Sequence, residues 1–192
     1  MTDMFGRPGS NGVMLLCLDA LSLSADSDAD APAAQAGWSV NAARLLGHAR
    51  EQGWSVGHAI SRRPRPGEAP WRPLGGLAPE PSEPVYHRED PSAFSSPELC
   101  ATLDGRARRE VVLCGVSVRG SGLATALDAL NLKAPLTIAA DAAWLPPAER
   151  DGLDGLLRLQ SLGMVHSVVR LAQTEALLRP WRRLSVVQGG RR

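Results

Sequence analysis

Residues 108–132, RREVVLCGVSVRGSGLATALDALNL, carry the pattern that decides the fold. The apolar and largely β-branched run at residues 111–114 predicts a buried strand. Glycines at positions 115, 120 and 122 then permit a tight turn. Leucine and alanine follow at helical spacing, so we expect a helix from about Ser121. A strand that runs through a glycine-rich turn into a helix gathers unpaired backbone N–H groups, which suit an anion or a developing oxyanion.

Three kinds of site can place glycines in such a turn. A phosphate-binding loop needs a lysine directly after Gly120, where this chain has Ser121. A dinucleotide-binding turn needs a third glycine where this chain has Thr125. Both are therefore excluded. Two roles remain for Ser121. It is either a plain helix cap, which is the common role of serine at this position, or a nucleophile at the start of a helix.

The rest of the chain alternates strand-like and helix-like segments. We expect strands at residues 13–18, 54–60, 136–141 and 165–171 and within 85–94, helices at 39–51, 97–103, 146–162 and 174–178, and a polar loop at 24–36. Ser39 and Thr174 are the expected caps of their helices. This order predicts an α/β fold, with a doubly wound, mostly parallel sheet of about six strands and helices on both faces. The 192 residues fit one domain, with a core at about 12–178 and a basic tail at 179–192.

Asp19 follows the unbroken apolar run at residues 13–18. Such a run predicts a parallel strand that is covered on both faces. An ionisable residue at the carboxyl end of such a strand lies where open α/β sheets bind their ligands. The alternative is that Asp19 simply begins a loop. The residue types alone do not decide between a ligand-binding residue and a loop residue.

Composition excludes several classes of protein. The net charge of +1 provides no overall field for nucleic acid or a membrane surface. The apolar run at residues 13–18 is too short to span a bilayer, and no basic segment of a signal peptide precedes it. Three cysteines, an odd number with two in apolar runs, indicate reduced thiols in a soluble, cytoplasmic protein. The basic tail either contacts a neighbouring subunit or stays disordered, and we expect a homo-oligomer.

No residues have the spacing of metal ligands. Asp26, Asp28 and Asp30 begin like a calcium loop, but Ala31 and Gly37 stand where that loop needs glycine and glutamate. No other cluster of His, Asp or Cys has ligand spacing, so we expect neither a metal nor another cofactor.

Residues 61–84 hold seven of the fifteen prolines, which indicates an irregular surface loop or a lid over the site. The loop is rich in arginine, but only Lys133 among the 21 basic residues is a lysine, so each arginine is a weak clue to function. His48 and His58 precede this loop, and a histidine in such elements is more often a core or surface residue than a ligand.

Three separate segments share one pattern. The first is Gly115-Val116, followed by Ser121 and by Thr-Ala-Leu-Asp-Ala at residues 125–129. The second is Leu-Leu-x-x-Asp, which ends at Asp19, and the third is VYHREDPSAF at residues 85–94. Together they resemble the isochorismatase-like hydrolases, a superfamily that includes cysteine amidohydrolases and the vinyl-ether-cleaving isochorismatases. Metal-binding nicotinamidase relatives carry an Asp-x-His ligand set where this chain has Ser-Arg-Arg at residues 61–63.

The resemblance implies where a catalytic site lies. The Asp-Lys-Cys triad of the cysteine members maps onto Asp19, Arg88 and Ser121, so two of the three positions differ. Because alternate residues of a strand face opposite ways, only one of His87 and Arg88 can point into the site. The resemblance also implies substrate-binding or oxyanion-binding positions at Val116, Ser117 and Phe94, with the backbone N–H groups of Ser117 and Ser121 as the oxyanion donors.

The two exchanges change the chemistry that the site can support. A cysteine readily forms a thiolate, whereas a serine needs a good base, and no histidine maps to the site. An arginine can hold a carboxylate with two N–H groups but cannot exchange a proton. We therefore expect a hydrolase of this family that acts on a small anionic molecule, a carboxylate or an amide, with Asp19 as general acid or base and no cysteine nucleophile. A catalytically silent member that binds a small acid or serves as an oligomeric partner, and a Ser121-dependent amide or ester hydrolase, stay open as alternatives.

Overall fold

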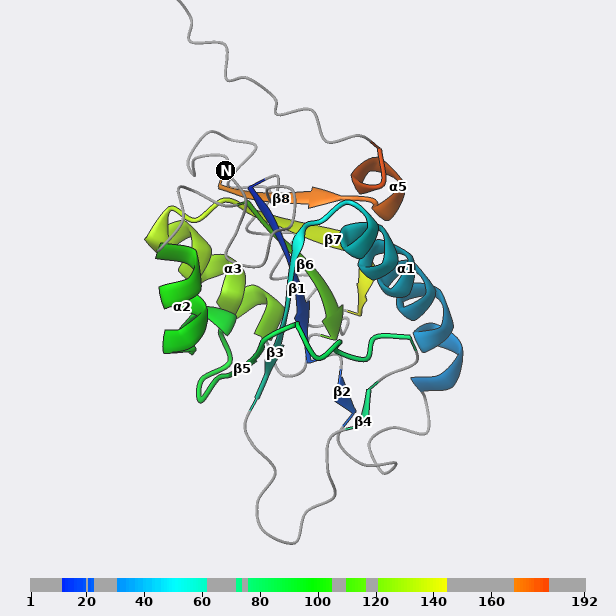
Figure 1. The fold of residues 1–192 in the computed structure, drawn as a ribbon, viewed down its shortest axis with the longest axis horizontal. Coiled ribbons are helices and arrows are strands. Elements are labelled where there is room, and N and C mark those ends of the chain that lie inside the picture. Colours follow the sequence, from blue (N-terminus) through cyan, green and yellow to red (C-terminus); the bar gives the residue numbers. More distant parts are fainter. Residues whose placement is uncertain are drawn as a thin grey trace, which may run out of the picture.

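Two layers of helices enclose a central parallel sheet in the computed structural model of the chain (Figure 1). The structure describes residues 12–19, 21–22, 31–61, 72–73, 76–104, 110–116, 121–144 and 168–179. Among the helices in these ranges, none combines the length and the hydropathy that a bilayer-spanning segment needs. The three-layer arrangement confirms the α/β fold that the sequence predicts.

The sheet has six parallel strands, in agreement with the predicted mostly parallel sheet of about six, and their order is β5-β3-β1-β6-β7-β8. Their bounds are β1 (Val13–Leu18), β3 (Ser55–Ile60), β5 (Val85–His87), β6 (Glu110–Val116), β7 (Leu136–Trp144) and β8 (Val169–Ala172). β1 lies inside the sheet, paired with β3 on one side and with β6 on the other. A separate antiparallel pair, β2 (Leu21–Ser22) and β4 (Arg72–Pro73), is missing from the sequence prediction, because two residues are too few to show a strand pattern.

The helices divide between the two faces of the sheet. Their bounds are α1 (Ala31–Glu51), the 3₁₀ helix η1 (Ala93–Ser95), α2 (Pro97–Asp104), α3 (Ser121–Leu132) and α5 (Thr174–Leu177). α1 and α5 cover one face, and α2 and α3 cover the other (Figure 1). Each face therefore has its own hydrophobic core.

The unbroken apolar sequence of β1 follows from its position between these cores. Its odd-numbered residues, from Val13 to Cys17, belong to the core beneath α1. Its even-numbered residues, from Met14 to Leu18, belong to the core beneath α2 and α3. All six are at most 2% exposed, so a polar residue at any of these positions would be buried.

The start of α1 differs from the prediction. The helix begins at Ala31, so the expected loop at residues 24–36 is wrong from residue 31 onward, and Ser39 lies inside the helix and does not cap it. Pro32 is favourable in the first turn of a helix, and alanine, which follows it, is the strongest helix former. The helix ends at Glu51 as expected, and Gly53 then takes a left-handed φ of 66°.

Thr174 does not cap the last helix, in contrast to the prediction. Gln173 is the N-cap residue and makes no capping bond with its side chain. The backbone N–H and the hydroxyl of Thr174 both donate to Oδ1 of Asp141 in β7, at 2.7 and 2.8 Å. Asn41 of α1 donates to the other carboxylate oxygen of Asp141 at 3.2 Å. One carboxylate on a distant strand therefore joins three elements and replaces a local cap.

Other predicted elements fall partly or wholly outside the described residues. The expected helix at 146–162 lies outside them, as does most of the tail at 179–192. The strand expected at 165–171 is described from residue 168, and β8 extends one residue beyond it. The loop at 61–84 is described at residues 61, 72–73 and 76–84.

A partly buried ion-pair network lies beneath the end of α1. Glu83 accepts two N–H groups of Arg50, at 2.8 and 2.9 Å, and its carboxylate lies 3.0 Å from Nε2 of His58. Burial alone would raise the pKa of Glu83, but hydrogen bonds from Arg50, the Glu80 backbone and His58 lower this pKa to about 2. Burial lowers the pKa of His58, which is 0% exposed. His58 is therefore a core histidine.

Cys17 and Cys114 face each other across β1 and β6. The strand register pairs them, and their Sγ atoms lie 3.6 Å apart as free thiols. The hydrogen bond to Cys114, together with burial, raises the pKa of the Cys17 thiol well above its usual range. Both thiols are shielded from solvent, and the raised pKa keeps the Cys17 thiol protonated.

Candidate active site

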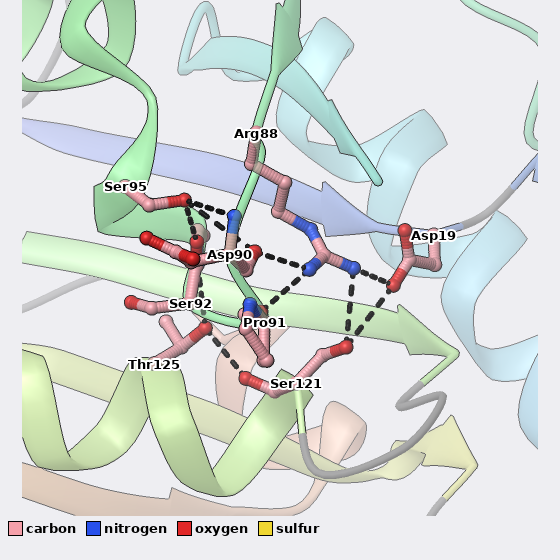
Figure 2. Close-up of polar contacts among 9 residues, drawn as sticks. Asp19, Arg88, Asp90, Pro91, Ser92, Ser95, Ser121 and Thr125 are labelled. Atoms are coloured by element: carbon pink, nitrogen blue, oxygen red, sulfur yellow. Dashed lines mark hydrogen bonds and ion pairs between the residues drawn. The ribbon is translucent and has the colours of Figure 1, made fainter. Parts of the chain in front are cut away.

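Asp19 lies directly after β1, at the carboxyl edge of the sheet. Its backbone enters the left-handed region with a φ of 45°, and its N–H donates to the carbonyl of Ala59 at 2.9 Å. Aspartate tolerates this conformation better than most residues do. The turn ends the strand, and the buried carboxylate lies against Arg88 and Ser121 (Figure 2).

Gly115 of β6 pairs with Leu18, the residue just before Asp19. A Cβ atom at Gly115 would lie 2.2 Å from the carbonyl oxygen of Leu18 and 2.9 Å from its nitrogen, and φ at Gly115 is 110°. Only glycine permits this approach, because side chains with a Cβ rarely adopt such a φ and the atoms in the way are backbone. Gly115 lies within β6, before the turn that its residue type suggests, and allows close packing beside the site.

Arg88 follows β5, and 3% of its side chain is exposed. Nη1 donates to the carbonyls of Asp90 and Pro91, at 2.9 and 2.6 Å. Nη2 donates to Oδ2 of Asp19 and to Oγ of Ser121, the latter at 3.1 Å. Each of the four terminal N–H groups therefore has an acceptor, which holds the cation in one orientation (Figure 2).

Ser121 is the first residue of α3, and 1% of it is exposed. Its Oγ accepts from Arg88 at 3.1 Å and donates to Oδ2 of Asp19 at 3.3 Å. The ends of β1 and β5 and the start of α3 thus bring together the three residues that the resemblance places at the triad positions. Their catalytic roles stay predictions.

Two opposing effects act on the proton affinity of Asp19. Burial raises the pKa of the carboxyl, while the ion pair and hydrogen bond with Arg88 and hydrogen bonds from Ser121 and the Ser61 backbone lower it. Burial is the larger effect, so the pKa of Asp19 is raised. A carboxyl of this kind can donate a proton nearer to neutral pH than an exposed aspartate can. The hydroxyl of Ser121 donates to this same carboxylate, at a long hydrogen-bond distance of 3.3 Å.

The other predicted site residues are placed differently. Val116 ends β6 at the same edge of the sheet, and Ser117 lies outside the described residues. Phe94 lies in η1, is 8% exposed and belongs to the hydrophobic core beneath α2 and α3. Binding of substrate or oxyanion by these three residues therefore stays a prediction.

Sequence reasoning missed the groups that hold the site together. The carbonyls of Asp90 and Pro91 accept from Arg88, and any residue type can supply a carbonyl, so the sequence carries no signal for them. Thr125 donates to the carbonyl of Ser121 at 2.7 Å and accepts the N–H of Ala93 at 2.9 Å. Its position is the missed signal, since a polar residue four places after Ser121 lies on the same face of α3.

Asp19, Arg88 and Ser121 give the described part of the site a carboxylate, a fixed cation and a hydroxyl. Within the described ranges, no three His, Cys, Asp or Glu side chains gather in a way that could hold a metal ion. The groups present can move a proton and orient a polar substrate.

Comparisons with known proteins agree with this architecture. A family model of the isochorismatase domain matches residues 13–165. Among solved structures, an isochorismatase from Pseudomonas putida KT2440 superposes with a TM-score of 0.67 at 21% identity, covering 88% of this chain and 92% of that one. An isochorismatase-like hydrolase from Alkaliphilus metalliredigens gives a TM-score of 0.68 at 17% identity, covering 88% and 98%. N-carbamoylsarcosine amidase from Thermoplasma acidophilum gives 0.64 at 17% identity, covering 84% and 96%.

At these identities the structural similarity shows the fold alone. A comparison with curated protein sequences finds no significant match. The family assignment therefore depends on the family model, which spans most of the chain.

Proposed function

The chain belongs to the isochorismatase family of hydrolases, and we propose that it hydrolyses a small molecule with Asp19 as general acid and base and without a cysteine nucleophile. The observation that carries this proposal is the buried contact of Asp19 with both Arg88 and Ser121. Of these three groups, the carboxyl is the one whose proton affinity suits transfer near neutral pH, because arginine does not release its proton and a serine hydroxyl is a very weak acid.

Asp19 can act in both directions of a proton transfer. Burial raises its pKa and favours the protonated acid, while the neighbouring Arg88 stabilises the carboxylate once the proton has left. Such an acid can protonate the enol carbon of a vinyl ether, after which water adds to the oxocarbenium ion. The water returns a proton to Asp19, and the resulting hemiketal separates into a ketone and an alcohol.

Arg88 has a different role from the substrate clamp that its residue type suggests. A bidentate grip on a carboxylate would require Arg88 to release at least two of the four acceptors that it holds. We therefore assign Arg88 to the orientation of Asp19 and Ser121. The substrate in this proposal is a small carboxylate or amide.

A serine-dependent hydrolase is the second candidate, and one observation favours it. Oγ of Ser121 donates to Asp19 at 3.3 Å and accepts from Arg88 at 3.1 Å, so a base and a cation both contact the hydroxyl. In this candidate, Asp19 removes the proton while Oγ attacks an amide or ester carbonyl, and water later releases the acyl group.

Three variants separate the candidates: Asp19→Asn, Ser121→Ala and the control Asp128→Asn, which changes a carboxylate of α3 outside the site. Initial rates are measured on a panel of small amides, N-carbamoyl amino acids and enol ethers with free carboxylates. We expect Asp19→Asn to abolish turnover and Ser121→Ala to cost less than about tenfold, or about 1.4 kcal/mol. Asp128→Asn should leave the rates unchanged.

The other candidates predict different results. A serine nucleophile predicts that Ser121→Ala loses several orders of magnitude in rate and that an acyl-enzyme appears in the mass spectrum of the wild-type protein. A collapse of equal size in Asp19→Asn and Ser121→Ala would contradict the proposed role of Asp19. A catalytically silent protein predicts no turnover, with stabilisation by a small acid in a thermal-shift assay.

The thiols support a cytoplasmic location, which is also part of the proposal. Cys17 and Cys114 lie 3.6 Å apart and are both free. Paired thiols that stay reduced are typical of a reducing compartment.

A further inference from the structure

Thr125 lies one turn after Ser121 on α3, and it is 0% exposed. Its hydroxyl donates to the carbonyl of Ser121 at 2.7 Å and accepts the N–H of Ala93 at 2.9 Å. One hydroxyl therefore joins the first turn of α3 to η1, and it does so beside the candidate site (Figure 2).

The segment that Thr125 contacts is the one that holds Arg88. Nη1 of Arg88 donates to the carbonyls of Asp90 and Pro91, two and three residues further along the chain. The N–H of Asp90 donates in turn to Oγ of Ser95 at 3.3 Å, which closes the loop between β5 and α2. Because the loop is bonded to itself, its position relative to α3 determines where the guanidinium lies.

We propose that Thr125 is a positioning residue of the site, whose hydroxyl fixes the loop after β5 against α3 and so keeps Arg88 in contact with Asp19 and Ser121. Arg88 and Ser121 belong to separate segments of the chain, and Thr125 joins these segments at the site. The effect of Thr125 on turnover rests on the proposed function of Asp19. Its effect on the ion pair can be measured without any substrate.

The measurable consequence is the proton affinity of Asp19. In the described part of the chain, Arg88 is the charged side chain that contacts Asp19, and Ser121 and the Ser61 N–H supply uncharged hydrogen bonds. For two unit charges at an effective dielectric constant of about 20, a separation that grows from about 3 to about 4 Å weakens the attraction by about one pKa unit, so a retreat of the guanidinium raises the pKa of Asp19 by an amount of this order.

The experiment compares Thr125→Val, which removes the hydroxyl and keeps the shape, with Thr125→Ser, which keeps the hydroxyl. The matched control is Thr137→Val, since the hydroxyl of this buried residue donates to Glu110 at 2.7 Å at the opposite edge of the sheet. The pKa of Asp19 is read from its carboxyl carbon resonance in an NMR titration of the full chain. Urea unfolding gives the stability of each variant.

We expect the pKa of Asp19 to rise by about one unit in Thr125→Val and to stay within about 0.2 unit of wild type in Thr125→Ser and Thr137→Val. If Thr125→Val and Thr137→Val leave the same pKa at Asp19, the proposal is overturned and Thr125 only supports the fold. Should Thr125→Val not fold, Thr125→Ala allows the same comparison.

Turnover separates this inference from the proposed function. On any substrate that the wild type hydrolyses, Thr125→Val should lower kcat and move the acid–base limb of the pH–rate profile together with the pKa of Asp19, and Thr125→Ser should restore both. A shifted pKa with an unchanged profile would count against Asp19 as the acid and base, and would leave the positioning role of Thr125 standing.

Discussion

Replacing Gly115 with alanine should destabilise the carboxyl edge of the sheet, where the candidate site lies. The new Cβ would lie 2.2 Å from the carbonyl oxygen of Leu18, 2.9 Å from its nitrogen and 3.1 Å from its carbonyl carbon. These are backbone atoms of an inner strand, so they cannot move without disturbing β1 and the adjoining Asp19. Left-handed strain costs about 1–3 kcal/mol and overpacking about 1–3 kcal/mol, which together predict a loss of about 2–6 kcal/mol. That is a large share of the stability of a typical domain.

A matched substitution with the opposite sign provides the control. Gly47 lies inside α1, and a Cβ there would have nothing within 4 Å. Gly47→Ala should therefore stabilise the protein by about 0.5–1 kcal/mol through helix propensity. Urea unfolding followed by circular dichroism measures both variants. A loss below about 1 kcal/mol in Gly115→Ala would refute the reasoning, because it would mean that β1 can yield at Leu18.

Two further predictions concern acid stability and thiol reactivity. The pKa of Glu83 is about 2 in the folded protein against an ordinary value of 4.5, so its contribution to stability is complete above pH 4.5 and is lost as the pH falls toward 2. We expect the free energy of unfolding of the wild type to fall by up to about 2 kcal/mol between pH 6 and pH 3, and that of Glu83→Gln to fall by less. A fall of equal size in the two proteins would contradict the stabilising role of the ion pairs and hydrogen bonds of Glu83. Cys17 and Cys114 should resist a thiol reagent until urea unfolds the chain, because both are buried; rapid labelling of either in the folded protein would show that the core opens.

The central strands and α3 could be predicted from the sequence because their patterns are strong. A parallel strand that is covered on both faces needs an unbroken apolar run, and residues 13–18 and 111–114 supply one each. α3 follows from its helical spacing of leucine and alanine. The resemblance singled out Asp19, Arg88 and Ser121, and the structure brings these three side chains into contact.

The remaining features depend on contacts that a linear pattern does not record. The alanine-rich start of α1 has helix propensity, but propensity alone does not decide whether a short segment becomes helix or loop. Thr174 has the residue type of a cap, yet Asp141, 33 residues earlier in the chain, takes its hydrogen bonds. The surroundings of Arg88 consist largely of carbonyls, which every residue type provides.

The pairing of β1 with β6 also has a consequence for how the protein folds. Cys17 and Cys114 are 97 residues apart in the chain, and Asp19 and Ser121 are 102 apart. Closing loops of this length costs chain entropy before any contact compensates for it, which slows folding. β1, α1 and β3, in contrast, lie close together in the chain and leave the ribosome before β6.

During synthesis at about 5–20 residues per second, β6 is completed roughly 3–11 seconds after β3. For those seconds β1 has no partner on the side that faces β6, and its apolar residues beneath α2 and α3 lack their cover. We therefore expect the nascent chain to need protection by chaperones in this interval. We also expect the contact between Asp19 and Ser121 to form only after the second half of the sheet has been made.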